Sequence, residues 1–454
     1  MTKQTLKIFI DVEDHFQAKA EYVFKEFCRY HKIIPDFVME VNDCDLYYGA
    51  DIDLQNNRIS IYHNPLSSIF FQEKQIYPIE DVLFIFYESI KLPFLFPNQV
   101  NKIDYKAQDI ISSAFYFLSC WQEYVLEDDI LPEERYDYKK SMQYQLGFLE
   151  QPVVDFYCKI FGDIIQKFLS PNTEYSFTYY LSHDIDYYNY WTKKHLYAIY
   201  KYNFKRFIKN PINSAYKLIG HFLTKNIIYK PDKVLKKLLN KEQKLGFKST
   251  SYLLTKSDIN DDRQEYMRNK EQLDSIKEIF EEENVALHGS KNASVNINLL
   301  KEELDLIKQS GFNVKGYRNH FLCFNYQKSF KILEELGFEN DSTLGFWEHI
   351  GFRAGTSLPF YPFNIEENRA FNVLEIPLCI MDVTLFSKKA MNLNYFKAKK
   401  KVFEMIDKAY KNKTNITILW HNYSFDCIDF PLWGKLYWDI LKYLKIIRTV
   451  IRSE

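Results

Sequence analysis

The 454-residue sequence contains no long apolar run, no pair of cysteines at C-x-x-C spacing and no surplus of charge of one sign. Its most apolar stretch, residues 82–96, is interrupted by Glu88, Lys91 and Pro93 and is shorter than the roughly 20 residues that a membrane-spanning helix needs. The seven cysteines are scattered, which indicates neither a cysteine-type zinc site nor a redox pair and fits a reducing compartment. We therefore expect no transmembrane segment and no disulfide framework.

The charge balance and the first residues narrow the class further. With 59 Lys and Arg against 60 Asp and Glu, the formal net charge is -1, so the chain lacks the concentrated cations that nucleic-acid binding needs. The N-terminal stretch turns acidic at residues 11–14 and lacks the apolar segment of a secretory signal. These features predict a cytoplasmic globular protein that binds no nucleic acid.

The hydrophobic content of 46% is enough for two cores. The turn-forming cluster Ser-Pro-Asn-Thr-Glu at residues 170–174 marks the best boundary, so we predict an accessory α+β domain of unknown role over residues 1–171 and a second domain over residues 172–454. In the second domain, apolar strand-like segments alternate with helical stretches, a pattern typical of parallel βα units. About seven such units predict an α/β fold, a distorted (β/α) barrel with its site at the carboxyl ends of the strands.

Residues 192–248 form a basic helical insertion in this second domain. Fifteen Lys and Arg face only Asp232 and Glu242, and apolar residues are interleaved at helical intervals. Three interpretations are open: a solvated helical face, a contact with a membrane surface, and a groove for an anionic glycan or a lipid-linked sugar.

The segment Leu-Ser-His-Asp-Ile-Asp at residues 181–186 ends a predicted strand. Strand alternation places Asp184 and Asp186 on the same side and His183 on the opposite side. Two close carboxylates repel each other unless a cation or an arginine lies between them. The pair therefore predicts one metal-bound carboxylate and one carboxylate that transfers a proton.

Three further strand ends carry polar side chains. His288 ends an apolar strand, where a ligand at the top of a barrel would be. Arg318 and His320 alternate on one face of the next strand end, where the arginine can pair with a carboxylate or with substrate. His421 follows a last apolar strand, next to Trp420, and is the natural general acid or base.

This ordered set resembles the polysaccharide deacetylases, carbohydrate esterase family 4 with the NodB-homology domain, over residues 175–454. The resemblance implies that Asp184 is the general base, Asp186 a metal ligand and His421 the general acid. It also implies that His288 is the first histidine of a metal motif and that Arg318 orients the base. We predict substrate contacts at His183, His320, Asp341, Arg353 and Trp420. Residues 1–171 resemble uncharacterised domains that precede such deacetylases in some bacterial proteins.

The sequence departs from the family pattern four residues after His288, where a second metal histidine is replaced by Asn292. Asparagine can offer a carbonyl oxygen, but it is a poorer ligand for zinc than imidazole. Three arrangements are therefore open: a divalent metal, expected to be Zn²⁺, held by Asp186, His288 and Asn292; a metal completed by another residue such as Ser290 or Ser294; and a site without metal.

The expected function is a metal-dependent hydrolase that removes an acyl group, expected to be N-acetyl, from a carbohydrate in cell-surface polysaccharide metabolism. Expected partners are an acylated carbohydrate, lipid-linked or anionic, and a membrane surface contacted by the basic insertion. Asn292 leaves open a catalytically inactive carbohydrate-binding or scaffold protein on the same fold. A glycosidase also uses paired carboxylates, but two Asp residues adjacent on one strand, with histidines opposite, fit that chemistry poorly.

Overall fold

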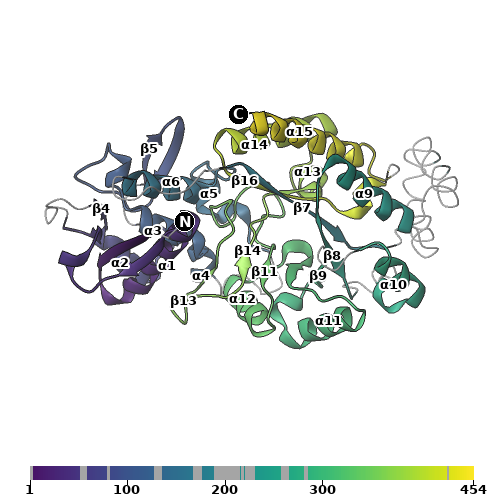
Figure 1. Ribbon diagram of the computed structural model, residues 1–454, viewed down its shortest axis with the longest axis horizontal. Coiled ribbons are helices and arrows are strands. Elements are labelled where there is room, and N and C mark those ends of the chain that lie inside the picture. Colours follow the sequence, from purple (N-terminus) through teal and green to yellow (C-terminus); the bar gives the residue numbers. More distant parts are fainter. Residues whose placement is uncertain are drawn as a thin grey trace.

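The computed structural model describes residues 4–51, 59–78, 82–126, 135–166, 176–188, 215, 219, 231–256, 265–280, 285–426 and 429–453. Two sheets organise these residues, a four-stranded sheet in the N-terminal part and an eight-stranded sheet in the C-terminal part, and they lie side by side along the long axis of the molecule (Figure 1). None of the described helices combines the length and the apolar character needed to cross a membrane.

The N-terminal part is built on four parallel strands in the order β2-β1-β3-β4. The strands are β1 (Thr5–Asp11), β2 (Ile34–Phe37), β3 (Leu46–Gly49) and β4 (Ile59–Tyr62), and an antiparallel hairpin adds β5 (Leu83–Tyr87) and β6 (Ile90–Phe94). The helices are α1 (Asp14–Tyr30), α2 (Pro65–Gln72), α3 (Ile110–Leu118), α4 (Trp121–Val125), α5 (Met142–Gln145) and α6 (Val153–Ile165). Helices α1, α3 and α6 pack on one another, and their apolar side chains belong to a core cluster that continues into the C-terminal part.

The C-terminal part is an eight-stranded sheet in the order β14-β11-β10-β9-β8-β7-β16-β15, with every pair parallel. The strands are β7 (Thr178–Ile185), β8 (Thr250–Leu254), β9 (Val285–Gly289), β10 (Gly316–Asn319), β11 (Asn340–Asp341), β14 (Leu374–Glu375), β15 (Ile380–Met381) and β16 (Asn415–Leu419), and β12 (Phe363–Asn364) pairs with β13 (Arg369–Ala370) outside this sheet. The main helices are α9 (Pro231–Leu245), α10 (Lys270–Lys277), α11 (Ile297–Gln309), α12 (Tyr326–Glu335), α13 (Asp382–Phe386), α14 (Tyr395–Lys411) and α15 (Trp433–Ser453). The predicted distorted (β/α) barrel with a smaller accessory part is confirmed. Of the predicted basic insertion, helix α9 is described; residues 192–214, 216–218 and 220–230 lie outside the described residues.

Local sequence explains the barrel elements. Strands β9 and β16 are buried along their whole length, as expected of parallel strands covered on both faces. The helices that follow the strands begin at asparagines: the side chains of Asn296, Asn325 and Asn394 accept hydrogen bonds from backbone N–H groups in the first turns of α11, α12 and α14. At the end of β9, a Cβ on Gly289 would lie 2.2 Å from the Tyr317 hydroxyl, so the close packing of β9 against β10 requires glycine there.

A long loop of the barrel, residues 342–362, packs against the N-terminal part. Arg353 forms a buried ion pair with Glu123, with its Nη2 atom 2.6 Å from the Glu123 carboxylate. Asp155 of α6 accepts hydrogen bonds from the Thr356 hydroxyl at 2.7 Å and from the Ser357 backbone N–H at 3.0 Å. Charged and polar groups are thus paired across the contact, which fixes the loop to the N-terminal part.

Candidate active site

The carboxyl end of β7 presents two carboxylates to the inside of the barrel. Because side chains alternate along a strand, Ser182 and Asp184 share one face, and Arg318 of β10 reaches both of them. Its Nη1 atom donates to the Ser182 hydroxyl and to Asp184 Oδ1, each at 2.9 Å. Arg318 also lies over the ring of Tyr252 at 4.0 Å, so the guanidinium is held on two sides.

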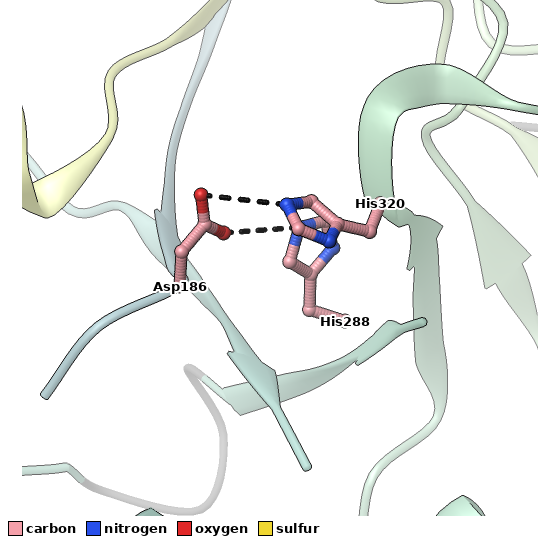
Figure 2. A group of neighbouring side chains, drawn as sticks. All are labelled: Asp186, His288 and His320. Atoms are coloured by element: carbon pink, nitrogen blue, oxygen red, sulfur yellow. Dashed lines mark ion pairs between the residues drawn. The ribbon is translucent and has the colours of Figure 1, made fainter. Parts of the chain in front are cut away.

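Asp186, His288 and His320 form a buried group in which one ligand atom from each residue lies within 4.8 Å of the others. The His288 Nε2 atom is 3.3 Å from Asp186 Oδ1, and the His320 Nε2 atom is 3.6 Å from Asp186 Oδ2. Figure 2 shows both imidazole rings turned toward the same carboxylate. One carboxylate and two imidazoles are a donor set that Zn²⁺ and related divalent cations prefer, and three protein ligands leave a coordination position open for water or substrate.

The hydrogen bonds around His288 test whether a cation fits. Its Nδ1 atom lies 3.0 Å from the Arg318 carbonyl oxygen, which can only accept, so the ring carries its proton on Nδ1 and in its neutral form directs a lone pair from Nε2. This Nε2 atom and Asp186 Oδ1 are both buried, and neither has a hydrogen-bond partner among the described residues. Two electron-pair donors that face each other without a partner are satisfied by a cation, so the residues fit a divalent metal.

His320 reaches this group through an unusual turn after β10. Phe321 and Leu322 have φ angles of 63° and 55°, in the left-handed region that costs non-glycine residues about 1–2 kcal/mol each. The Phe321 ring stacks on the His320 imidazole with the centroids 3.9 Å apart. The Asn319 side chain donates to the backbone carbonyls of Lys291 and Cys323, which closes the turn. Backbone strain of this kind is commonly retained at functional sites, and here it turns the His320 imidazole toward Asp186.

The predicted third ligand, Asn292, is not part of this group. It is exposed at the N-cap of the 3-10 helix Ala293–Val295, whereas Asp186, His288 and His320 are buried. The alternatives Ser290 and Ser294 are engaged elsewhere, because the Ser290 hydroxyl donates to Glu303 and the Ser294 hydroxyl donates to the Cys323 carbonyl. We therefore revise the ligand set: His320, predicted as a substrate contact, takes the position that the sequence assigned to Asn292.

His421 completes the site from the end of β16. Its Nε2 atom lies 4.0 Å from Asp184 Oδ2 and 3.8 Å from Asp186 Oδ2. On the other side of the ring, Nδ1 donates to Asp382 Oδ1 at 2.6 Å, and the His421 backbone N–H donates to Asp382 Oδ2 at 3.0 Å. Asp382 therefore fixes both the orientation and the tautomer of His421. Sequence analysis missed Asp382, since the strand before it, β15, has only two residues.

The electrostatic environment acts in opposite directions on the two carboxylates and on His421. Burial disfavours ionised Asp184, but His288 and Arg318 more than offset this and lower the pKa of its carboxyl. Burial likewise opposes ionised Asp186, but His320 and His288 hold its pKa well below the usual value. Burial disfavours charged His421, yet Asp382, with the two site carboxylates, raises the pKa of this imidazole to about 9. In the metal-free protein both carboxylates are thus ionised and His421 carries a proton at neutral pH.

His183 and Trp420, predicted to contact substrate, lie behind the sheet. His183 Nδ1 is 2.7 Å from the Trp420 carbonyl oxygen and its Nε2 is 2.7 Å from Glu242 of α9, so both ring nitrogens donate within the protein. Trp420 is fully buried against Trp433 and Tyr437. The prediction is wrong for both residues because strand alternation turns them away from the site face.

Asp341 and Arg353 are also structural. Asp341 is fully buried at the end of β11, where it accepts hydrogen bonds from the backbone and the hydroxyl of Thr343. Burial, and then the charge of the neighbouring Asp341, raise the pKa of Glu375 well above its usual value. Arg353 is used by the ion pair with Glu123. Their predicted substrate contacts are therefore not supported by the positions of these side chains.

Comparisons with known proteins bear mainly on the N-terminal part. Residues 8–170 match DUF7033, a family of unknown function. Comparison with curated proteins gives no match. Among solved structures, a chain described as "putative polysaccharide deacetylase from Mycobacterium smegmatis" aligns with 14% identity and a TM-score of 0.38, over 60% of this chain and 86% of that chain. An alignment at this identity and TM-score does not establish what the chain does.

Proposed function

We propose that the C-terminal part is a metal-dependent hydrolase that removes an acyl group, in the first instance N-acetyl, from a carbohydrate of cell-surface polysaccharide metabolism. The observation that carries the proposal is the position of His421 Nε2, which lies within 4.0 Å of a carboxylate oxygen of Asp184 and of Asp186 at the carboxyl ends of the strands. The choice of carbohydrate as substrate rests on the resemblance of the motifs to polysaccharide deacetylases.

The side chains of the site divide into a holding group and a proton-transfer group. Asp186, His288 and His320 would hold a divalent cation such as Zn²⁺, which when bound supplies polarisation of the acyl carbonyl and acidification of a water molecule. Asp184, kept ionised by Arg318, accepts the proton of the attacking water. His421, oriented by Asp382, donates a proton to the departing nitrogen or oxygen of the sugar.

The alternative of a non-catalytic carbohydrate-binding protein loses its main support. That interpretation rested on Asn292 as a poor metal ligand, whereas His320 supplies an imidazole to the group of Asp186 and His288. A protein that only binds sugars has no evident need for two buried carboxylates, a buried arginine and an Asp-supported histidine at one point.

Hydrolysis can be tested on the full-length protein supplied with Zn²⁺. Acetate release would be measured from N-acetylglucosamine oligosaccharides and from O-acetylated sugars, for the wild type, Asp184→Asn and His421→Gln. Because each variant removes one proton-transfer group and keeps the metal ligands, we expect kcat to fall on the order of 10²–10⁴-fold in both.

Asn292→Ala is the matched control, because this residue is exposed beside the site and outside the ligand group. Its rate should equal that of the wild type. Acetate release that is unchanged in Asp184→Asn, or no release from any acetylated sugar by metal-loaded wild type, would remove the proposed function.

A further inference from the structure

Helices α9 and α15 lie next to each other on one flank of the barrel (Figure 1). Together they present a basic face. We define this face by Lys237 and Lys241 of α9 and by Lys442 and Lys445 of α15. The Lys241 ammonium lies 3.8 Å from the centre of the Trp438 ring, which joins the two helices at the middle of the face. Positions 438, 442 and 445 recur at helical spacing, so the two α15 lysines extend from this tryptophan in one stripe.

The lysines of the basic face repel one another. Partial burial, and then the charges of Lys442 and Lys237, lower the pKa of Lys241. Among the described residues, no carboxylate forms an ion pair with any of the four lysines. The nearest acids on the two helices are used elsewhere: Glu242 is buried with His183, and Asp439 accepts from Lys399 at 3.0 Å. A concentration of cations that the described fold does not neutralise favours an external anion.

An apolar side chain lies beside these cations. Ile446, one residue after Lys445, is 61% exposed, and the half-buried indole of Trp438 lies under Lys241. A soluble polyanion needs cations alone, whereas the surface of a membrane accepts lysines at the headgroups and apolar or indole groups at the acyl boundary. The combination of lysines with exposed apolar and indole groups therefore favours a membrane surface over a soluble polyanion.

We propose that the basic face of α9 and α15 docks on a membrane surface that contains anionic lipids. The sequence before and within α9 supports this proposal. Residues 192–248, which end just after α9, hold fifteen Lys and Arg against two acidic residues, a large excess of positive charge. The docking surface is separate from the metal-ligating group, and its test does not use hydrolysis, so either proposal can fail without the other.

The test is flotation of the full-length protein with vesicles of phosphatidylglycerol and phosphatidylcholine, compared with vesicles of phosphatidylcholine alone. We expect binding to the anionic vesicles only, and loss of binding at about 0.5 M salt because screening shortens the reach of the lysines. Lys442→Glu/Lys445→Glu changes the charge of the face by four. Since each charge near an anionic surface changes affinity roughly fivefold, binding should weaken by more than about 100-fold.

The matched control is Lys301→Glu/Lys308→Glu, which makes the same change of charge at exposed positions of α11. This variant should stay within a few-fold of the wild type. A third variant, Ile446→Ser, should weaken binding to vesicles and leave binding to dextran sulfate unchanged. Equal losses in the two charge variants, no binding of wild type to anionic vesicles, or binding to dextran sulfate without binding to vesicles would each overturn the proposal.

Discussion

The largest differences between the predicted and the observed site concern His320 and Asn292. The buried imidazole of His320 belongs to the ligand group, and the amide of Asn292 is exposed. Loss of an outer partner of a metal ligand costs roughly 10–100-fold in affinity, and loss of a ligand itself should cost more. We expect His320→Ala to bind Zn²⁺ more than about 100-fold more weakly than the wild type, and Asn292→Ala to bind it equally well, as measured by competition with a chromogenic chelator.

The reverse order of the two variants would restore the original assignment of Asn292. His288→Ala serves as the positive control, because both assignments include this residue. Elemental analysis after dialysis against trace zinc gives an independent measurement of stoichiometry.

Asp382 can be tested as a positioning residue for His421. The substitution Asp382→Asn keeps the shape of the side chain but places an amide where the imidazole needs an acceptor, so His421 is turned to the wrong tautomer. We expect kcat to fall on the order of 10²–10⁴-fold while KM changes little. Asp382→Glu should recover part of the rate, which a merely structural role would not produce. A proportional rise in KM, with kcat unchanged, would contradict the positioning role.

At the scale of single elements, the His183 side chain links strand β7 to helices α9 and α15. Glu242 accepts from His183, from the Ser249 hydroxyl at 2.6 Å and from the Tyr437 hydroxyl. Burial disfavours the charged forms of both partners, but the Glu242 carboxylate raises the pKa of His183 above 6.5, and His183 lowers the pKa of Glu242 below 4.5. The pair therefore makes its full contribution to the free energy of unfolding between pH 4.5 and pH 6.5.

The sign of the pH dependence follows from these shifts. The part due to His183 is present below pH 6.5 and is lost as the pH rises through the raised pKa; the part due to Glu242 is present above pH 4.5 and is lost as the pH falls through the lowered pKa. We expect Glu242→Gln to lower the free energy of unfolding, measured with urea, by about 3 kcal/mol near pH 5.5. The loss should be smaller near pH 9. Glu302→Gln, at an exposed pair, should show a small and constant difference.

A difference between Glu242→Gln and the wild type that grew toward pH 9 would contradict the assignment of the charged pair.

Elements were predictable where the pattern was long. Alternation of apolar strands and amphipathic helices predicted the barrel, and strand alternation predicted that Asp184 and Asp186 share a face. Strands β11 and β15 have two residues each and leave no periodicity to detect. The turn that aims His320 uses left-handed backbone at Phe321 and Leu322, residue types that give no signal of such a turn.

At the scale of the whole molecule, stability depends in part on a contact between the N-terminal and C-terminal parts. The Arg353–Glu123 pair joins residues 230 positions apart in the chain, a separation at which no local pattern could have predicted it. Removing one partner leaves a buried charge without a counter-charge, which costs about 3–5 kcal/mol. We expect Glu123→Ala to lower the stability of the full-length protein by this amount, as measured by the shift of its urea unfolding transition.

The double variant Glu123→Leu/Arg353→Met is the control, because it removes both charges and keeps apolar volume. Its stability should lie within roughly 1 kcal/mol of the wild type. If Glu123→Ala were as stable as the wild type, the pair would not hold the two parts together.

The pairing of β7 with β16 has a consequence for how the protein is made. The Ser182 hydroxyl donates to the Ile418 carbonyl across this pair although the two residues are 236 positions apart in the chain. On the ribosome, the chain presents Asp186, His288 and His320 long before β16 emerges, so the ligands of the metal can assemble while one edge of β7 is still open to other chains. Asp382 precedes β16 in the chain, and His421 follows it. A nascent chain therefore carries the Asp–His–His group before it has His421, and the proposed hydrolytic site is complete only when the final strand closes the sheet.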